Sequence, residues 1–213
     1  EIYTLSLHDA LPISTSPTPG PCTRSAPCSK NFCPSGAYPV NAEHAARNVR
    51  LVVLDVDGVL TDGGLYYDST GGVMKRFNVQ DGLGIKMAAR AGLEFAVITG
   101  LDSPAVAGRV AELGIRHYYP GQHRKAPFLR QISENSGIPL QHAAYIGDDW
   151  VDAAPMSLVG LPMAVANARP EILRLAAWTS TACGGQGAVR EALEFILKAQ
   201  GRLESLWREW TQA

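Results

Sequence analysis

An apolar run in this sequence ends abruptly in acidic residues. Residues 51–54 are all aliphatic, and Asp55, Asp57 and Gly58 follow them within four positions. Two carboxylates this close together raise each other's energy unless a cation lies between them. A hard divalent metal with oxygen ligands would supply that cation. The alternative is a strand that ends in a solvated acidic turn, and this segment alone favours neither.

Two further apolar segments also end in polar residues. Residues 95–98 are followed by Thr99, and residues 143–146 are followed, after one glycine, by Asp148 and Asp149. Ligands of parallel α/β sheets bind outside the carboxyl ends of the strands. If these segments are neighbouring strands, their polar residues are expected to gather in one site.

The elements that must position these residues alternate along the chain. Apolar segments predict strands at residues 49–54, 95–98, 115–119, 143–146, 161–165 and 178–179. Helical patterns predict helices at residues 82–91, 104–113, 123–135, 151–159 and 187–208, with a short helix from Pro170. Such alternation is typical of an α/β, Rossmann-like fold in which helices flank a parallel sheet. Two short apolar segments around a turn at residues 68–72 predict a β-hairpin at residues 65–77.

Composition excludes several classes of partner. The chain has 213 residues, 46% of them hydrophobic, with a net charge of -1, which is enough for one good core. A charge near zero gives no electrostatic reason to expect nucleic acid or an anionic membrane surface. No apolar stretch is long enough to cross a bilayer. These features predict a cytoplasmic protein whose ligand is a small molecule.

The four cysteines are unevenly placed. Cys22, Cys28 and Cys33 lie in the first segment, and Cys183 stands alone beyond it. A disulfide framework for the main body is therefore excluded, which fits a reducing compartment. The first three lack the paired short spacing of zinc ligands, so zinc is not favoured.

Residues 1–45 differ in composition from the rest. They are rich in Ser, Thr, Pro and Cys and show neither helical nor strand periodicity. The segment starts with Glu1 and has no basic region before its apolar residues, so it does not resemble a signal peptide. We expect residues 1–45 to be a disordered or foreign extension and residues 46–213 to form a single folded domain.

Two common catalytic motifs are missing from the sequence. It has no Gly-x-x-x-x-Gly-Lys-Ser/Thr loop for nucleotide phosphates and no Gly-x-Ser-x-Gly turn for a serine nucleophile. The glycines at residues 184–187 could form a phosphate cradle, but a turn or helix cap is the commoner use of such a cluster.

The ordered set of motifs resembles that of the haloacid dehalogenase phosphatases. Asp55-Val-Asp57-Gly-Val-Leu-Thr-Asp62, the Thr99-Gly100 pair, Lys125 and the segment from Gly147 to Asp152 match the four motifs of that family over about residues 48–200. A lone Asp-x-Asp pair says little, whereas the set at matching strand ends is specific. The resemblance implies a phosphatase that forms an aspartyl-phosphate.

The resemblance also assigns roles to individual residues. It makes Asp55 the nucleophile, and Asp57 the acid and base that protonates the leaving oxygen and later activates water. Thr99 would donate its hydroxyl, with a backbone amide, to the phosphoryl oxygens. Lys125 would neutralise the charge of the phosphate and Asp55.

Magnesium is the cofactor that the resemblance implies. Its ligands would be Asp55, the backbone carbonyl of Asp57, and Asp148. Asp149 and Asp152 would orient the metal site or Lys125.

The spacing between the motifs leaves no room for a large cap domain. Residues 62–95 hold only the predicted hairpin and one helix, and residues 99–125 hold one helix and one strand. The site of such an enzyme is open unless a neighbouring subunit covers it, and the apolar hairpin suits that purpose.

Within the family, the body resembles 3-deoxy-D-manno-octulosonate 8-phosphate phosphatases. The matching segments are residues 57–63, 75–82, 121–125 and 184–191. Family membership would imply magnesium dependence, a role in lipopolysaccharide biosynthesis, and a homotetramer with intersubunit active sites. The residues that would contact the sugar-acid phosphate are Asn78, Val79, Gln80, Asp81, Gly82, Lys86, Gly100, Arg109 and Lys125.

The sequence departs from the family pattern at residues that concern the substrate. Gln80 and Leu101 stand where the family commonly has Arg, and Gly72 and Val73 stand where acidic residues often precede the hairpin lysine. A phosphatase for a nine-carbon ulosonic acid 9-phosphate of the sialic-acid type is therefore the main alternative. A phosphotransferase would need a cap to exclude water. A non-catalytic interaction domain on the same fold is a further alternative, and it fits poorly with the presence of both Asp55 and Asp57.

Overall fold

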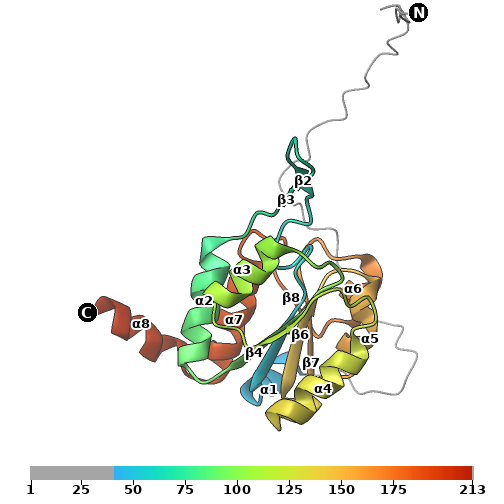
Figure 1. Cartoon of the computed structure of the whole chain (residues 1–213). Helices are drawn as coiled ribbons and strands as arrows, with labels where there is room; N and C mark the ends of the chain where they lie inside the picture. Colours follow the sequence, from blue (N-terminus) through green and yellow to red (C-terminus); the bar gives the residue numbers. More distant parts are fainter. Residues whose placement is uncertain (1–40, 213) are drawn as a thin grey trace, which may run out of the picture.

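The computed structural model describes residues 41–212 and has one large sheet at its centre (Figure 1). Within these residues six parallel strands run in the order β5-β4-β1-β6-β7-β8. Their bounds are β1 Leu51–Leu54, β4 Glu94–Ile98, β5 His117–Tyr119, β6 Ala143–Gly147, β7 Leu161–Ala164 and β8 Trp178–Thr179. The predicted parallel α/β fold is confirmed.

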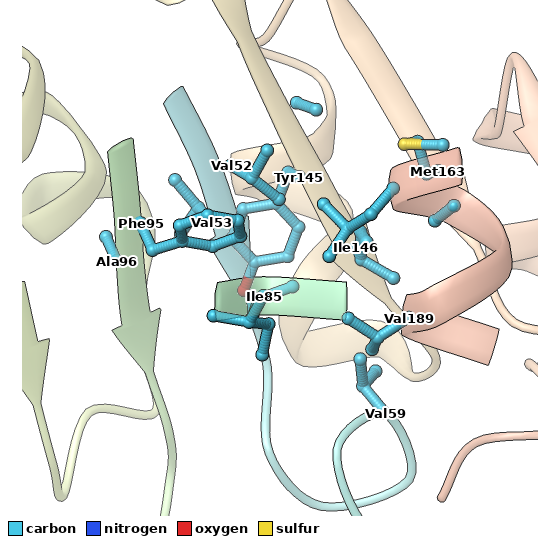
Figure 2. Close-up of a cluster of buried hydrophobic side chains, with 14 of the residues drawn as sticks. Val52, Val53, Val59, Ile85, Phe95, Ala96, Tyr145, Ile146, Met163 and Val189 are labelled. Carbon is cyan, nitrogen blue, oxygen red and sulfur yellow. The ribbon is translucent and has the colours of Figure 1, made fainter. Parts of the chain in front are cut away.

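Helices cover both faces of the sheet. They are α1 Ala42–Arg47, α2 Val79–Arg90, α3 Pro104–Glu112, α4 Ala126–Ser136, α5 Ala153–Met156, α6 Pro170–Leu175, α7 Ala188–Ala199 and α8 Leu203–Thr211, with 3-10 turns η1 Leu140–His142 and η2 Trp150–Asp152. In Figure 1, α2 and α7 lie together on one face, and α4 and α5 lie on the other. Figure 2 shows Ile85 of α2 and Val189 of α7 in the same buried cluster as Val53 and Ile146 of the sheet.

The central strands are apolar throughout because both of their faces are covered. All four residues of β1 and all five of β6 are buried. Leu54 pairs with Val97 on one side and with Ile146 on the other. This register ends the three strands at nearly the same level, which places the residues after them along one edge of the sheet.

A short hairpin stands apart from the sheet. Strands β2, Tyr66–Tyr67, and β3, Val73–Met74, pair in antiparallel fashion and project from the body (Figure 1). An isolated bridge between Thr61 and Phe77 closes its base. Between β1 and β4 the structure has only this hairpin and α2, as the capless spacing predicts.

Several element boundaries differ from the prediction. The helix expected at residues 151–159 is a 3-10 turn followed by α5, which ends at Met156. The long final helix is divided into α7 and α8 at Gly201, whose φ of 68° lies in the left-handed region that ends helices. Helix α2 begins at Val79, three residues earlier than expected, because Asn78 caps it.

The start of the body lies at Asn41, whose side chain caps α1. Helix α1 thus begins within the predicted extension of residues 1–45, and the prediction for residues 1–40 lies outside the described residues. No helix in the described part of the chain is long and apolar enough to cross a membrane.

Candidate active site

A buried lysine joins two acidic residues at the edge of the sheet. Asp55 follows β1 directly, and its Oδ1 lies 2.7 Å from Nζ of Lys125, which precedes α4. The same Nζ lies 2.8 Å from Oδ1 of Asp152. Lys125 is only 1% exposed. Burial by itself lowers the pKa of Lys125, but the negative charges of Asp55 and Asp152 outweigh it and raise that pKa. The ammonium group is therefore charged and fixed.

Asp152 connects this lysine to the loop after β6. Its Oδ1 also accepts a hydrogen bond of 2.7 Å from the hydroxyl of Tyr145. Its Oδ2 accepts bonds from the backbone N–H groups of Asp148 and Asp149, at 3.0 and 3.4 Å. Asp152 therefore positions both Lys125 and the backbone of the acidic loop.

Asp148 completes a cluster of acids. Oxygen atoms of Asp55, Asp148 and Asp152 lie within 4.8 Å of one another. Burial, followed by the charges of Asp152 and Asp149, raises the pKa of Asp148 to about 7. Burial and the charge of Asp152 raise the pKa of Asp55 to about 8, although Lys125 opposes the shift. Among the described residues, Lys125 is the one cation that pairs with this cluster.

The donors of this cluster fit a magnesium ion. Oδ1 of Asp148 is buried and accepts no hydrogen bond from the described residues. Both oxygens of Asp152, by contrast, are already occupied by hydrogen bonds. Asp55 and Asp148 are thus the residues that could hold a hard cation, and their assignment as metal ligands stays a prediction.

Thr99 lies at the end of β4, beside β1. It is fully buried, and its hydroxyl has no hydrogen-bond partner within the described residues. Its own N–H donates to the carbonyl of Tyr119, 3.1 Å away. The hydroxyl is therefore available for a phosphoryl oxygen, whereas the amide expected to assist it must belong to another residue.

Asp57 has an unexpected partner. Its Oδ1 accepts from Nζ of Lys75, which lies directly after β3 at the base of the hairpin. The sequence places Lys75 in a matching segment without assigning it a role. Since the two residues are 18 positions apart and the hairpin must fold back to join them, no local pattern signals the contact.

The glycines at residues 184 and 185 lie against the loop that follows Asp57. The N–H of Gly185 donates to the carbonyl of Val59 at 2.9 Å. A Cβ atom on Gly184 would lie 1.6 Å from the carbonyl oxygen of Gly58. Gly58 has a φ of 90°, and a Cβ on it would lie 2.1 Å from Oδ2 of Asp148. Close backbone packing therefore accounts for the glycines at these positions.

A cavity of about 390 Å³ lies between the hairpin base and α3. Its lining consists of Lys75, Phe77, Val79, Pro104, Ala105, Gly108, Arg109 and Glu112. The guanidinium of Arg109 lies 5.8 Å from the ring centre of Phe77 and is held by Glu112 at 2.8 Å. Among the predicted substrate contacts, Val79 and Arg109 thus face a cavity.

The other predicted substrate contacts are placed differently. Asn78 caps α2, and Lys86 lies 3.8 Å from Glu112. Gly100 packs against the ring of His123, and a Cβ at Gly82 would collide with Arg109. Asp81 is buried, and its Oδ1 accepts from the N–H of Arg190 at the start of α7, so its visible contact is a helix cap. Gln80 is exposed at the start of α2.

Comparison with known proteins relates this site to one family. A family model described as haloacid dehalogenase-like hydrolase matches residues 109–193, which include Lys125 and Asp148. 3-Deoxy-D-manno-octulosonate 8-phosphate phosphatase KdsC of Escherichia coli K12 is 44% identical over 168 residues, which are 78% of this chain and 89% of that protein. The chain belongs to this phosphatase family. The predicted resemblance is thereby confirmed.

Solved structures of the phosphatase family agree with the fold of this chain. The Moraxella catarrhalis enzyme, in complex with magnesium, phosphate and KDO, has a TM-score of 0.78 at 38% identity and covers 79% of this chain and 97% of its own. The cobalt-bound Haemophilus influenzae enzyme has a TM-score of 0.73 at 40% identity and covers 75% and 93%. Each of these relatives is therefore matched over most of its length.

Proposed function

We propose that this protein is a magnesium-dependent phosphatase that converts 3-deoxy-D-manno-octulosonate 8-phosphate to 3-deoxy-D-manno-octulosonate and phosphate. The observation that carries the proposal is the Asp55 carboxylate, fixed by Lys125 beside Asp148. The buried Thr99 hydroxyl, which has no partner among the described residues, follows the neighbouring strand β4. The relatives at 44% identity carry this activity in their names, and one solved relative holds magnesium, phosphate and the sugar acid.

Asp55 is held ready for attack on phosphorus. Its Oδ1 accepts from Nζ of Lys125 and from the N–H of Val56 at 2.7 Å. These two bonds fix the plane of the carboxylate and leave Oδ2 without a hydrogen bond from the described residues. Attack forms a bond between a carboxylate oxygen and phosphorus and breaks the bond from phosphorus to the sugar oxygen.

Proton transfer falls to Asp57. It gives a proton to the departing sugar oxygen, and it later takes a proton from the water that attacks the aspartyl-phosphate, which releases phosphate and restores Asp55. Thr99 and Lys125 stabilise the charge that develops on the phosphoryl oxygens. Magnesium, held by Asp55 and Asp148, supplies further positive charge when it is bound. Asp149 and Asp152 orient the loop that carries Asp148.

The test is phosphate release from a panel of eight-carbon and nine-carbon ulosonic acid phosphates and hexose phosphates, with and without magnesium. We expect the eight-carbon substrate to give the highest kcat/KM. Asp55→Asn should abolish release, while Glu204→Gln on exposed α8 should leave it unchanged. A folded, magnesium-loaded protein that releases phosphate from no member of the panel would falsify the proposal.

A nine-carbon substrate is the second candidate. The family commonly has Arg at two positions where this chain has Leu101 and Gln80. Leu101 is 43% exposed, and Gln80 is also exposed. Without these two guanidinium groups the pocket holds less positive charge for the sugar acid. A higher kcat/KM on the nine-carbon member of the panel would select this alternative.

We also propose a homotetramer whose hairpins contribute to neighbouring sites, in a cytoplasmic enzyme. The hairpin supports this because Leu65, Tyr66, Tyr67 and Met74 all expose large apolar side chains. Light scattering on the full chain tests the assembly, and a monomer would contradict it. Cell fractionation tests the location.

A further inference from the structure

We propose that Lys75 is a positioning residue that holds Asp57 in the orientation required for proton transfer, so that the hairpin acts on the reaction through this lysine. The inference rests on the proposed function, in which Asp57 is the acid and base. It gives the β2–β3 hairpin, which is not part of the large sheet, a role in the chemistry.

The environment of Lys75 differs from that of its neighbours. Its side chain is 1% exposed, whereas the side chain of Arg76 is 55% exposed and Met74 is also exposed. Burial of an ammonium group is costly unless a carboxylate and good hydrogen-bond geometry compensate. Asp57 supplies that compensation, and the pair therefore holds both side chains in place.

The contact with Lys75 engages only one of the two carboxylate oxygens of Asp57. Lys75 donates to Oδ1, and Oδ2 has no hydrogen bond from the described residues. Rotation of the carboxylate would break a bond to a buried charge, so Oδ2 is left as the oxygen that faces a reacting group. Lys125 cannot take over this function, because its Nζ is engaged with Asp55 and Asp152.

Contacts at the base of the hairpin fix the position of Lys75. The bridge from Phe77 to Thr61 ties it to the loop after β1, and a hydrogen bond of 3.2 Å from Nη1 of Arg76 to the carbonyl of Gly185 ties it to the glycine cluster that packs on this loop. Lys75 also lines the cavity of about 390 Å³ that contains Arg109. Its side chain therefore lies between that cavity and Asp57, and it couples the position of the hairpin to the proton-transfer residue.

The test compares two substrates with different leaving groups. A sugar phosphate needs a proton on its departing oxygen, whereas 4-nitrophenyl phosphate releases a stable phenolate and does not. In single turnovers of the magnesium-loaded full chain, which report leaving-group release before water attacks the aspartyl-phosphate, we expect Lys75→Met to lower the rate of sugar release about 100-fold, near the lower end of what general acid catalysis contributes. On 4-nitrophenyl phosphate we expect a fall of about tenfold or less, with KM changed less than about twofold on both. Lys198→Met, the same change at an exposed position of α7, should alter neither.

A double-mutant cycle separates positioning from a structural role. In an Asp57→Asn background, Lys75→Met should have less than about a twofold further effect, and this double variant leaves neither charge of the pair buried alone. Lys75→Arg, which retains the charge, should recover part of the rate of sugar release and also serves if Lys75→Met does not fold. Equal losses on the two substrates, a full effect in the Asp57→Asn background, or a change confined to KM would each overturn the inference. If the wild type releases no phosphate from either substrate, the proposed function itself fails. If the wild type is active and only the Lys75 variants behave differently from the expectation, the inference about Lys75 fails alone.

Discussion

Removal of metal should make the stability of this protein fall as the pH rises. Burial and neighbouring acids raise the pKa of Asp148 from 3.8 to about 7 in the metal-free site. A carboxyl group with a raised pKa binds its proton more tightly in the folded than in the unfolded chain. The contribution of Asp148 to folding stability is therefore complete below about pH 4 and is lost as the pH rises to 7, with Asp55 extending the decline to about 8.

The size of the effect follows from the shift. Each pKa unit corresponds to about 1.4 kcal/mol, so Asp148 alone should cost about 4 kcal/mol once it is ionised, of which about 3 kcal/mol falls between pH 5 and pH 8. For a chain of this size, 1 kcal/mol changes Tm by about 2–4 °C, which gives a fall of roughly 6–12 °C. Magnesium binds the ionised carboxylates and at a hundredfold excess over its Kd should restore about 2.7 kcal/mol.

The assay is thermal unfolding of the full chain between pH 5 and pH 8, in EDTA and in magnesium. We expect a steep decline of Tm in EDTA, a shallower one in magnesium, and the largest gain from magnesium at pH 8. Asp148→Asn removes the titrating group and should flatten the EDTA curve, which separates Asp148 from all other groups. A metal-free Tm that rises over this range, or a slope that Asp148→Asn leaves unchanged, would refute the reasoning.

Four further substitutions test the packing and the pocket. Gly184→Ala places a Cβ 1.6 Å from the carbonyl oxygen of Gly58. Overpacking of this kind lowers the free energy of unfolding by about 1–3 kcal/mol, and displacement of the loop that carries Gly58 should also lower kcat. Gly108→Ala in α3 meets no atom and should raise Tm by a few degrees. Tyr145→Phe removes the 2.7 Å hydrogen bond to Asp152 and should cost about 1.5–3 kcal/mol in unfolding experiments, as bonds to charged groups do. Leu101→Arg should lower KM for the eight-carbon sugar-acid phosphate, and an unchanged KM would show that this position does not contact the substrate.

The strand-end residues could be predicted because each depends on local sequence. An apolar run followed by Asp55, Thr99 or Asp148 requires only that the strands be parallel neighbours, and the register of β1 with β4 and β6 then brings them together. A charged group can follow a buried strand only where the strand leaves the core, so local sequence is enough to locate these residues.

The contacts that the sequence did not reveal join segments far apart in the chain. Lys75 meets Asp57 only after the hairpin folds back, and Gly185 meets Val59 from more than a hundred residues away. The carboxylate of Asp81, a predicted substrate contact, accepts a hydrogen bond from the N–H of Arg190 at the start of α7, and its role at the substrate stays a prediction. An acid in a matching segment can serve a ligand or a helix end equally well, and only tertiary packing decides between them.

The charges of the site point to a single divalent ion. Asp55, Asp57, Asp148 and Asp152 contribute four carboxylates, and the two lysines that pair with them contribute two positive charges, so two negative charges remain for one magnesium ion to balance. Phosphatases with two metals place a second ion about 3.5–4 Å from the first. Here the ammonium group of Lys125 already lies 2.7 Å from Asp55 and supplies positive charge beside that carboxylate. Because Lys125 is buried and held by two acids, it cannot move aside without leaving charges unpaired, and the second cation of this site is therefore a fixed part of the protein.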